Sequence, residues 1–350
     1  MRVLVAMSGG VDSSVAAARL IAAGHEVVGV TMKLWGGESD TGCCSVSDVD
    51  DARRVAQQLG IAHHTWTFTD DFDRGVVDPY VDAHRRGITP NPCIECNRHL
   101  KFDRLLRRAD AVGFDAVATG HHARIVTRAD GTRRLARGAD AAKDQSYVLY
   151  VLGQDELSRT LLPVGEMTKA EVRAEADALG LRTARKPDSQ DVCFITSGSG
   201  RRGFLGGRIE LRPGRVVDAA GCELGSVDAV ELVTLGQRRG LGLPGGGPPR
   251  YVVDVDVPAA TVRVGPEPDL LCEEVALERM VWSVAPTAAG CVSPIAAQCS
   301  AHGPPRVARI EPVGDEGALV RFVHPERRVA RGQSVVLYDG DEVIGGGIAA

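Results

Sequence analysis

The chain has 350 residues, of which 44% are hydrophobic and 25% charged, so it has enough apolar material for a folded core, and its length predicts two or three domains. No stretch is long and apolar enough to cross a membrane, and the start of the sequence lacks a signal-peptide pattern, which favours a cytoplasmic protein. The net charge of −5 argues against a globally basic nucleic-acid-binding protein, so any RNA binding has to use local basic patches.

A glycine-rich loop follows the first predicted strand, Arg2–Ala6. The hexapeptide SGGVDS, residues 8–13, separates this strand from a helical pattern over Ser13–Ala23. Glycines let the backbone approach a ligand closely, and the N–H groups and dipole of a helix N-terminus favour phosphate. The loop lacks the Gly-Lys-Ser/Thr ending of a Walker A loop and the spacing of a dinucleotide fingerprint. It therefore predicts a different nucleotide loop, the alternative being a glycine turn with an Asp/Ser helix cap.

Strand and helix patterns continue to alternate through the first half of the chain. Strands are predicted at Glu26–Thr31, His63–Phe68 and Ala116–Thr119, and helices at Val46–Leu59, Arg98–Val112 and Lys169–Leu179. Thr168 and Glu171 form a capping box at the start of the last helix. This alternation predicts the α/β class, with a doubly wound parallel sheet.

The pattern changes after Phe194. A Ser-Gly-Ser-Gly linker over 197–200 is followed by short β-rich runs separated by glycine and proline. Strands are predicted at Arg215–Asp218, Ala229–Thr234, Arg250–Val257, Thr261–Val264, Ala318–Val323, Ser334–Tyr338 and Val343–Ile348. We therefore expect three domains: an α/β domain over 1–196, a small β-rich domain over 197–270 and a C-terminal β-barrel over 271–350.

Two of the nine cysteines lie where sulfur chemistry is expected. In a large chain without an export signal, cysteines favour free thiols, metal ligands or catalytic sulfur over a disulfide framework. Cys96 precedes the basic helix, whose dipole and cations Arg98 and Lys101 favour a thiolate, so it is predicted to be a nucleophile. Cys193 lies far downstream, where a polar loop turns into an apolar run. Two such cysteines can meet and cycle between thiol and disulfide.

Metal binding is the alternative for some of these residues. Cys93 and Cys96 have the spacing of half a zinc site, but no second pair at a suitable spacing follows, so reactive thiols are favoured. The histidine pair at 121–122 either binds a metal or lines the nucleotide pocket. Cys43 and Cys44 are predicted to lie in a loop near the nucleotide, with no role assigned.

Seven motifs, taken in order, resemble the tRNA-specific 2-thiouridylases, a family of ATP pyrophosphatases. They are SGGVDSS, NPCIECN followed by LKF, ATGHHAR, AKDQSYVLY, KPDSQDVCFI, LGQRRGLGLP and GQSVVLYDGDEVIGGG, and they span essentially the whole chain. The resemblance implies an enzyme that uses ATP and Mg²⁺ to adenylate the C2 oxygen of the wobble uridine in certain tRNAs. A cysteine persulfide then delivers sulfur, and AMP leaves.

The resemblance also implies roles for individual residues. Cys193 is expected to carry the persulfide, Cys96 to attack it, and Asp12 to help hold Mg²⁺ together with ATP. The residues expected to bind ATP are Ala6, Met7, Ser8, Gly9, Gly10, Val11, Asp12, Ser13, Met32 and Gly120. Those expected to contact tRNA and its target base in the anticodon loop are Asn91, Pro92, Cys93, Lys143, Asp144 and Gln145. The expected sulfur donor is a protein such as a cysteine desulfurase or a sulfur-relay protein.

Two positions depart from the family pattern. Many relatives carry Asp at the position of Cys93, where an acid/base role has been assigned, and an unperturbed thiol is a much weaker acid than a carboxyl group. Glu95 is the nearest carboxyl group in the sequence that could take over this acid/base role. An Arg-Tyr pair common in relatives is missing from the segment 300–302, which puts a tRNA contact there in doubt.

Two other functions fit parts of the sequence. The chain could be an ammonia-dependent ligase of the same ATP-loop class, or a nucleotide-gated RNA-binding module without catalysis. The pair Cys96 and Cys193 discriminates between these functions, because neither alternative needs two reactive thiols.

Overall fold

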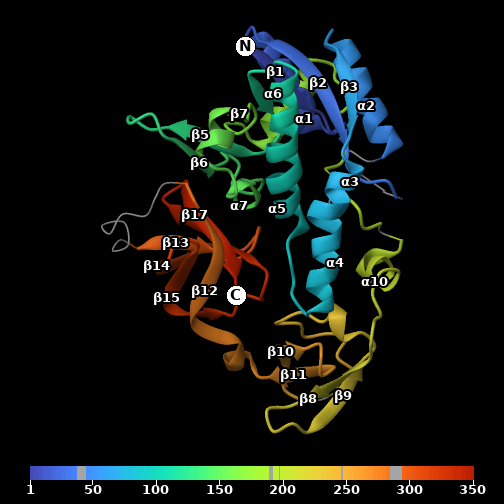
Figure 1. Ribbon diagram of the computed structural model, residues 1–350, viewed down its shortest axis with the longest axis vertical. Helices are drawn as coiled ribbons and strands as arrows, with labels where there is room; N and C mark the ends of the chain where they lie inside the picture. Colours follow the sequence, from blue (N-terminus) through green and yellow to red (C-terminus); the bar gives the residue numbers. More distant parts are fainter. Residues whose placement is uncertain (38–44, 189–191, 197, 246, 284–293) are drawn as a thin grey trace.

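The computed structural model describes residues 1–37, 45–188, 192–196, 198–245, 247–283 and 294–350. Within these residues the chain forms an α/β domain, a small β-rich domain and a C-terminal β-barrel, in chain order (Figure 1). This arrangement confirms the predicted fold class. Among the described helices, none combines the length and the apolar character needed to span a bilayer.

A parallel five-stranded sheet forms the centre of the first domain. Its order is β3-β2-β1-β4-β7. The strands are β1 (Arg2–Ala6), β2 (Glu26–Lys33), β3 (His63–Thr67), β4 (Ala116–Ala118) and β7 (Thr160–Leu161). Val3, Leu4 and Val5 of β1 are all fully buried, as expected for a central parallel strand that is covered on both faces.

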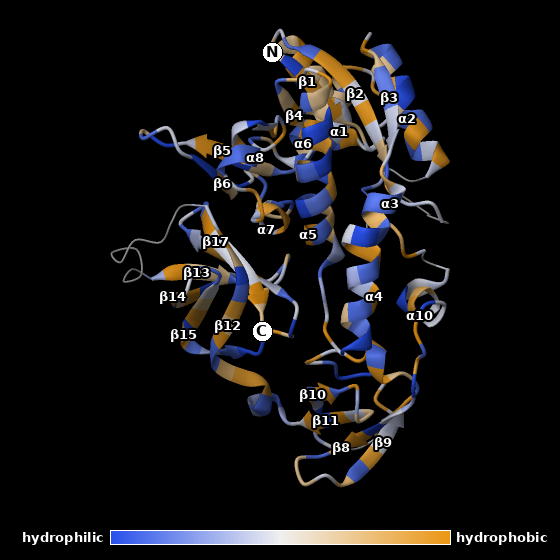
Figure 2. Cartoon of the chain, viewed as in Figure 1, coloured by the Kyte–Doolittle hydropathy of each residue, from blue (hydrophilic) through white to orange (hydrophobic). Residues whose placement is uncertain are grey.

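Helices cover both faces of this sheet, as in a doubly wound fold. Val3 and Val5 pack with α1 (Val11–Ala22), α2 (Val46–Gln58) and α9 (Lys169–Ala178), whereas Leu4 packs in a second core cluster with α6 (Leu105–Ala111). The alternation of β1 side chains between two clusters follows from the two-residue period of a strand. Figure 2 shows β1 and β2 as largely hydrophobic, and helix α2 with hydrophilic residues on its outer surface.

Strand β1 has β2, the next strand in the chain, on one side and β4 on the other. In parallel sheets, ligands bind at the carboxyl ends of strands where the order reverses in this way. The loop 8–13 follows β1 and the loop 119–122 follows β4, so both lie at this point.

The helix that carries Cys96 begins earlier than predicted. It runs without a break through α5 (Pro92–Cys96), the π-helical segment η2 (Asn97–Arg104) and α6, with Asn91 as its N-cap. The prediction of a start at residue 98 was wrong because proline is tolerated at the first helical position, where its missing N–H has no intrahelical partner. Before it come α3 (Thr69–Phe72), the π-helical segment η1 (Asp73–Val77) and α4 (Asp78–Arg85).

The second domain contains a four-stranded sheet in the order β10-β11-β8-β9. Its elements are α10 (Gly200–Gly206), β8 (Gly214–Val217), β9 (Glu223–Val227), the 3₁₀ helix η3 (Val230–Leu232), β10 (Tyr251–Asp256) and β11 (Thr261–Gly265). The predicted strand at 229–234 was wrong. Ala229, Val230, Glu231 and Val233 are all buried, so the run lacks the alternation of a half-buried strand, and residues 230–232 form a 3₁₀ turn instead.

Six antiparallel strands close into the C-terminal barrel, because β12 pairs with both β15 and β17. They are β12 (Leu271–Trp282), β13 (Ile295–Gln298), β14 (Arg306–Val313), β15 (Gly317–Arg327), β16 (Ser334–Asp339) and β17 (Glu342–Ala349), and the short 3₁₀ helix η4 (Glu267–Leu270) precedes them. A hairpin of the first domain, β5 (Ala123–Thr127) and β6 (Arg133–Arg137), joins the barrel at the pair Ala136 and Glu342.

A short segment of the first domain docks onto the barrel. It comprises α7 (Ser146–Leu149) and Tyr150 and is followed by α8 (Gln154–Ser158). The Tyr147 hydroxyl donates to the Ser334 carbonyl at 2.7 Å, and the Tyr150 hydroxyl lies 3.1 Å from the Ser334 hydroxyl. Gly346 of β17 leaves room for the Tyr150 ring, since a Cβ there would lie 2.6 Å from it. Buried hydroxyls with specific partners thus fix the barrel relative to the parallel sheet.

Removing one of these hydroxyls should weaken the docking. We expect Tyr147→Phe to lower the free energy of unfolding by about 1–2 kcal/mol, because the Ser334 carbonyl is left without its buried donor. Urea unfolding of the full chain measures this. The control is Tyr251→Phe in the second domain, where the tyrosine is only partly buried. Equal midpoints for wild type and Tyr147→Phe would contradict the docking role.

Candidate functional site

Two glycines allow close packing around the loop 8–13. Gly9 has φ +76°, a left-handed conformation, and a Cβ on it would lie 2.1 Å from the Asp48 carbonyl oxygen. Gly120, which follows β4, lies against the start of α1, where a Cβ would be 2.5 Å from the Ser13 nitrogen. Gly120 therefore packs against the start of α1, next to the loop. Its contact with the adenine and ribose of ATP stays a prediction.

The first turn of α1 keeps its N–H groups available. Gly10 is the N-cap and forms no side-chain cap, in contrast to α9, where Thr168 and Glu171 form the predicted capping box. The hydroxyls of Ser13 and Ser14 donate to the Gly10 carbonyl, at 3.1 and 2.8 Å. Because these serines act as donors to the backbone rather than as caps, the loop presents backbone donors and a positive dipole end, which suit an anion.

Asp12 lies at the centre of a charge network beside this loop. The Lys169 ammonium lies 2.8 and 2.7 Å from its two carboxylate oxygens, and His122 Nε2 donates to it at 3.0 Å. Burial works to raise the pKa of Asp12, but the hydrogen bonds from His122 and Lys169 outweigh burial and lower the pKa. Asp12 is therefore a carboxylate, and its negative charge is already balanced by a lysine.

Lys186 holds the other side of the loop. Its ammonium donates to the Gly9 carbonyl at 3.0 Å and to Asp51 at 2.7 Å, and it also contacts Asp48. Burial works to lower the pKa of Lys186, but the two carboxylates outweigh it and raise the pKa. A permanently charged ammonium thus lies against the backbone of the glycine pair.

Asp188 gathers three cations. Lys143, Lys169 and Arg173 donate to it at 2.8, 2.9 and 2.7 Å. Burial alone would raise its pKa, but the hydrogen bonds from Lys143 and Lys169 dominate and lower the pKa to about 2. Arg173 also donates to the carbonyls of residues 184 and 186, so the whole segment 183–188 is fixed against α9.

Sequence reasoning missed Lys169 and Lys186 as parts of this site. A compositional signal was available, since the chain has only five lysines against 36 arginines. Three of the five, Lys143, Lys169 and Lys186, belong to the network around the loop. A compact ammonium is a point charge that adapts to phosphate, whereas the guanidinium group has a fixed planar geometry.

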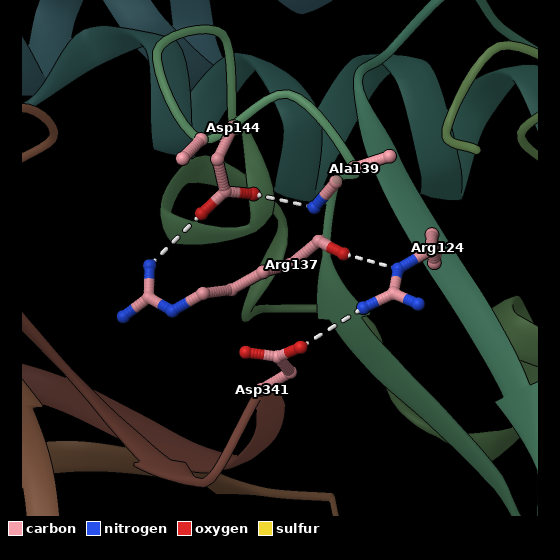
Figure 3. Close-up of a pocket in the computed structure, with 7 residues that line it drawn as sticks. Arg124, Arg137, Ala139, Asp144 and Asp341 are labelled. Carbon is pink, nitrogen blue, oxygen red and sulfur yellow. Dashed lines mark hydrogen bonds and ion pairs between the residues drawn. The ribbon is translucent and has the colours of Figure 1, made fainter. Parts of the chain in front are cut away.

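The predicted tRNA-contact residues at 143–145 are engaged within the protein. The Asp144 side chain is only 7% exposed; it accepts from Arg137 at 2.9 Å and from the backbone N–H of Gly138 at 3.0 Å. Asp144 lines a pocket of about 300 Å³ together with Arg124, Arg137 and Asp341. Figure 3 shows these side chains around the pocket. The Gln145 side chain accepts from the His122 N–H at 2.9 Å. Of the three, only Lys143 is substantially exposed.

Cys96 is buried in the second turn of its helix. Asn91 accepts from the Cys93 N–H at 3.1 Å as the N-cap, and Pro92 is buried behind it. The dipole effect is greatest in the first turn. The dipole therefore favours the thiolate of Cys93 more than that of Cys96, in contrast to the expectation from the sequence. The expected thiolate at Cys96 stays a prediction based on the cations near it.

Cys93 is open to solvent on one side but closely surrounded by protein on the others. This burial raises the pKa of its thiol, although Lys101 works in the opposite direction. Cys93 is therefore a neutral thiol near pH 7. Glu95 cannot donate a proton there either. Burial works to raise its pKa, but His99, Arg98 and Arg279 outweigh burial and lower it.

Cys193 packs against the same core cluster that contains Cys96. The next residue, Phe194, is almost fully buried, and its ring centroid lies 5.0 Å from that of Phe204 and 5.6 Å from that of Phe72. This aromatic contact anchors the cysteine segment. Cys193 follows Asp188, whose carboxylate binds Lys143 and Lys169, by only five positions. Because an extended chain of that length spans at most about 18 Å, Cys193 lies within this distance of Asp188.

Two of the predicted ATP-binding residues are buried in the protein core, and other predicted residues fall outside the described part of the chain. Met7 and Met32 are buried in the two core clusters on opposite faces of the sheet. Cys43 and Cys44 fall outside the described residues, as does the segment 189–191 just before Cys193.

His121 connects the loop to the cysteine helix. It follows β4 next to His122, its Nδ1 lies 2.7 Å from the Thr119 hydroxyl, and its ring lies 6.0 Å from that of Phe102 in η2. Burial, with Lys101 and His122 nearby, lowers the pKa of His121 well below its usual value. A neutral, buried histidine thus joins the charge network of Asp12 to the helix that contains Cys96.

No group of three or more His, Cys, Asp or Glu side chains in the described part of the chain is arranged to hold a metal ion. Asp12 is the one predicted metal-binding residue, and both of its oxygens contact Lys169. A divalent cation here would depend on phosphate oxygens for most of its ligands.

Comparison with protein families gives three consecutive matches. A profile described as "tRNA methyl transferase HUP domain" matches residues 1–197, one described as "tRNA methyl transferase PRC-barrel domain" matches residues 202–266, and one described as "Aminomethyltransferase beta-barrel domain" matches residues 273–349.

Several curated proteins are similar to the chain over its whole length. Those of Mycobacteroides abscessus and Mycolicibacterium paratuberculosis are each 49% identical, over 360 and 357 residues, and that of Roseiflexus castenholzii is 46% identical over 371 residues. Each alignment covers 99% of this chain and 98–99% of the relative. All three relatives are named tRNA-specific 2-thiouridylase MnmA.

The lowered pKa of Asp188 predicts a specific dependence of stability on pH. A carboxyl group whose pKa falls on folding adds stability that is complete above its unfolded pKa, near 4, and is lost as the pH falls toward 2. We expect Asp188→Asn to be destabilised by about 1–2 kcal/mol at neutral pH, and this difference from wild type should shrink below about pH 4. Urea midpoints measured from pH 6 downward test this, with Asp177→Asn on α9 as the control. Parallel pH profiles for wild type and Asp188→Asn would contradict it.

Proposed function

The chain belongs to the tRNA-specific 2-thiouridylase family, and from this premise we propose how its residues carry out the ATP-dependent 2-thiolation of the wobble uridine of tRNA. The proposal depends most on one observation, that Cys193 packs on the core cluster that contains Cys96. The domain that holds both cysteines also holds a phosphate-binding loop with lysines around it.

Nucleotide binding is proposed at the loop 8–13. Three features support ATP there: the available N–H groups of α1, the ammonium of Lys186 against the glycine pair, and the ammonium of Lys169 beside Asp12. Together they suit the β- and γ-phosphates, which leave as pyrophosphate. A bound Mg²⁺ would neutralise charge on those phosphates, with Asp12 as the protein ligand once Lys169 turns to phosphate.

In the first proposed step, the C2 oxygen of uridine attacks the α-phosphorus of ATP. A bond forms between this oxygen and phosphorus, and the bond to pyrophosphate breaks. The product is an adenylated uridine, whose C2 oxygen can now leave as part of AMP. Backbone donors of α1 and the charged Lys186 stabilise the negative charge that develops on the departing pyrophosphate.

In the second step, the terminal sulfur of a Cys193 persulfide attacks C2, and AMP leaves. The Cys96 thiolate then attacks the inner sulfur of the C2-bound persulfide, at Cys193. The sulfur–sulfur bond breaks, its electrons stay with the 2-thiouridine, and Cys96 and Cys193 end as a disulfide. A reductant and a sulfur-donor protein, such as a cysteine desulfurase, restore the thiol and the persulfide between turnovers.

Proton transfer is proposed to proceed without an acid at position 93. Cys93 is a neutral thiol, and Glu95 is ionised and paired with cations. Neither group supplies a proton near pH 7 as a carboxylic acid would. An adenylated oxygen needs no proton to leave, so the chemistry does not require one there.

The two cysteines provide the decisive test of function. With ATP, Mg²⁺, a sulfur donor and unmodified tRNA, the wild type should form 2-thiouridine, as detected by mass spectrometry of digested nucleosides. Cys96→Ala and Cys193→Ala should lose at least 99% of turnover, while both still release pyrophosphate when ATP and tRNA are present. Cys222→Ala, an exposed cysteine of the second domain, is the control.

The outcome separates the alternative functions. Full 2-thiouridine formation by Cys193→Ala would contradict the sulfur relay. Incorporation of ammonia instead of sulfur would identify a ligase, and tRNA binding without pyrophosphate release in the wild type would identify a non-catalytic RNA-binding module.

Lys186 provides the test of nucleotide binding. Lys186→Met should weaken ATP binding by about tenfold or more, because a charge-assisted contact to phosphate is lost. Arg185→Ala is the matched control, since this neighbouring arginine is almost fully exposed. Isothermal titration with ATP and Mg²⁺ measures both. Equal affinity for Lys186→Met and wild type would place the phosphates elsewhere.

A further inference from the structure

A cluster of charges joins the barrel to the cysteine helix. Glu95, which precedes Cys96 in the chain, faces two guanidinium groups and a histidine ring through a single carboxylate oxygen. His99 Nε2 lies 3.1 Å from that oxygen, a nitrogen of Arg98 lies 3.8 Å from it, and a nitrogen of Arg279 lies 3.7 Å from it. Arg279 comes from β12 of the barrel, whereas the others belong to the α5–η2–α6 helix, whose α5 end faces the barrel in Figure 1.

The backbone of Arg279 is strained. Its φ is +52°, in the left-handed region, and it lies in the register shift between Glu278 and Val281 where β12 pairs with β17. This conformation is unfavourable for an L-residue, because its Cβ lies too close to the following carbonyl oxygen. The ion pair with Glu95 is long and the Arg279 side chain is 52% exposed, so this contact alone does not offset the strain. Strain of this kind is retained mainly at functional positions.

Arg98 adds donors that the protein does not use. Its Nε and Nη2 atoms are buried, and neither makes a hydrogen bond to any described residue. With Arg279, it gives two guanidinium groups that face one carboxylate. Such a cluster has hydrogen-bond donors and positive charge left for an anion.

The positive charge continues beyond His99. This residue also lines a hollow of about 270 Å³, in which Arg74 and Arg104 share Asp71, and Arg107 pairs with Asp103. Counting both parts of the surface, five arginines face three carboxylates. This local excess stands out in a chain whose net charge is −5.

We propose that the surface formed by Arg279, Arg98, His99 and the arginine-lined hollow binds backbone phosphates of the tRNA beside its target uridine. Arg279 is the residue that the barrel contributes, and Glu95 holds it in place until RNA displaces the pair. This inference builds on the proposed function, because the cluster adjoins Cys96 in the chain. Phosphate contacts of this kind position the RNA without reading its sequence.

Direct binding measurements test the proposal. Fluorescence anisotropy with an unmodified tRNA, without ATP, gives the dissociation constant at several salt concentrations. Arg279→Ala should weaken binding by about threefold to tenfold, and the slope of log K against log salt should decrease by about 0.7–0.9 for the lost phosphate contact. Arg279→Lys should retain most of the affinity. Arg309→Ala, an exposed arginine on β14, is the matched control and should bind as wild type does.

Two further variants separate an anion site from a simple clamp between domains. Arg279→Gly should weaken tRNA binding while the unfolding midpoint stays equal or rises, because glycine adopts φ +52° without strain. Glu95→Gln should strengthen binding by about twofold or more, since it releases both arginines from their competing carboxylate. If the cluster only held the domains together, Glu95→Gln would weaken binding as Arg279→Ala does.

The outcomes are distinct. Binding of Arg279→Ala with the affinity and salt slope of wild type would overturn the inference and leave the proposed function intact, provided that wild type forms 2-thiouridine. A wild type that neither binds tRNA nor forms product would overturn both. Loss of sulfur-donor stimulation in Arg279→Ala with unchanged tRNA binding would assign the surface to a protein partner and would also overturn the inference.

Discussion

The ammonium group of Lys169 is shared by two carboxylates from distant parts of the chain, Asp12 of the phosphate-binding loop and Asp188 of the segment that leads to Cys193. The geometry of the site depends on this shared cation. It links the first turn of α1 to the start of α9 and holds the segment 183–188 beside both. In the proposed complex, the phosphates of ATP compete with Asp12 and Asp188 for the same cation. We therefore infer that nucleotide binding and the placement of the cysteine segment are thermodynamically coupled.

The segment 143–150 extends this coupling to the barrel. Its first residues support the loop: Lys143 holds Asp188, and Gln145 holds the backbone of His122. Its last residues, Tyr147 and Tyr150, dock on β16 and β17 through buried hydroxyls. One short segment, with α7 at its centre, thus connects the proposed nucleotide site to the barrel. We infer that the barrel, which contributes Arg279 beside the cysteine helix, holds a defined position relative to the phosphate-binding loop.

The sequence alone predicted the features that depend on local pattern. Buried runs such as Val3 to Val5 predicted the parallel sheet, and the glycine pair at 9–10 predicted a turn before a helix, whose binding of phosphate stays a prediction. The start of the cysteine helix at Pro92 was missed because the helical pattern was taken to begin at Arg98, although Pro92 occupies the first helical position, where proline is tolerated. Lys186 and Arg279 were missed for a different reason. Their partners, Gly9 and Glu95, are more than 170 residues away, and no periodicity records such contacts.

The scarcity of lysine has a consequence for how the molecule responds to its chemical surroundings. Four of the five lysines are Lys101, in the helix of Cys96, and the three of the charge network, while arginines carry most of the remaining positive charge. A reagent that acylates primary amines therefore finds few lysines on this chain outside the charge network, since guanidinium groups do not react with it. Acetyl transfer to Lys169 or Lys186 would here remove the positive charge that holds Asp12, Asp48 and Asp188 around the glycine loop.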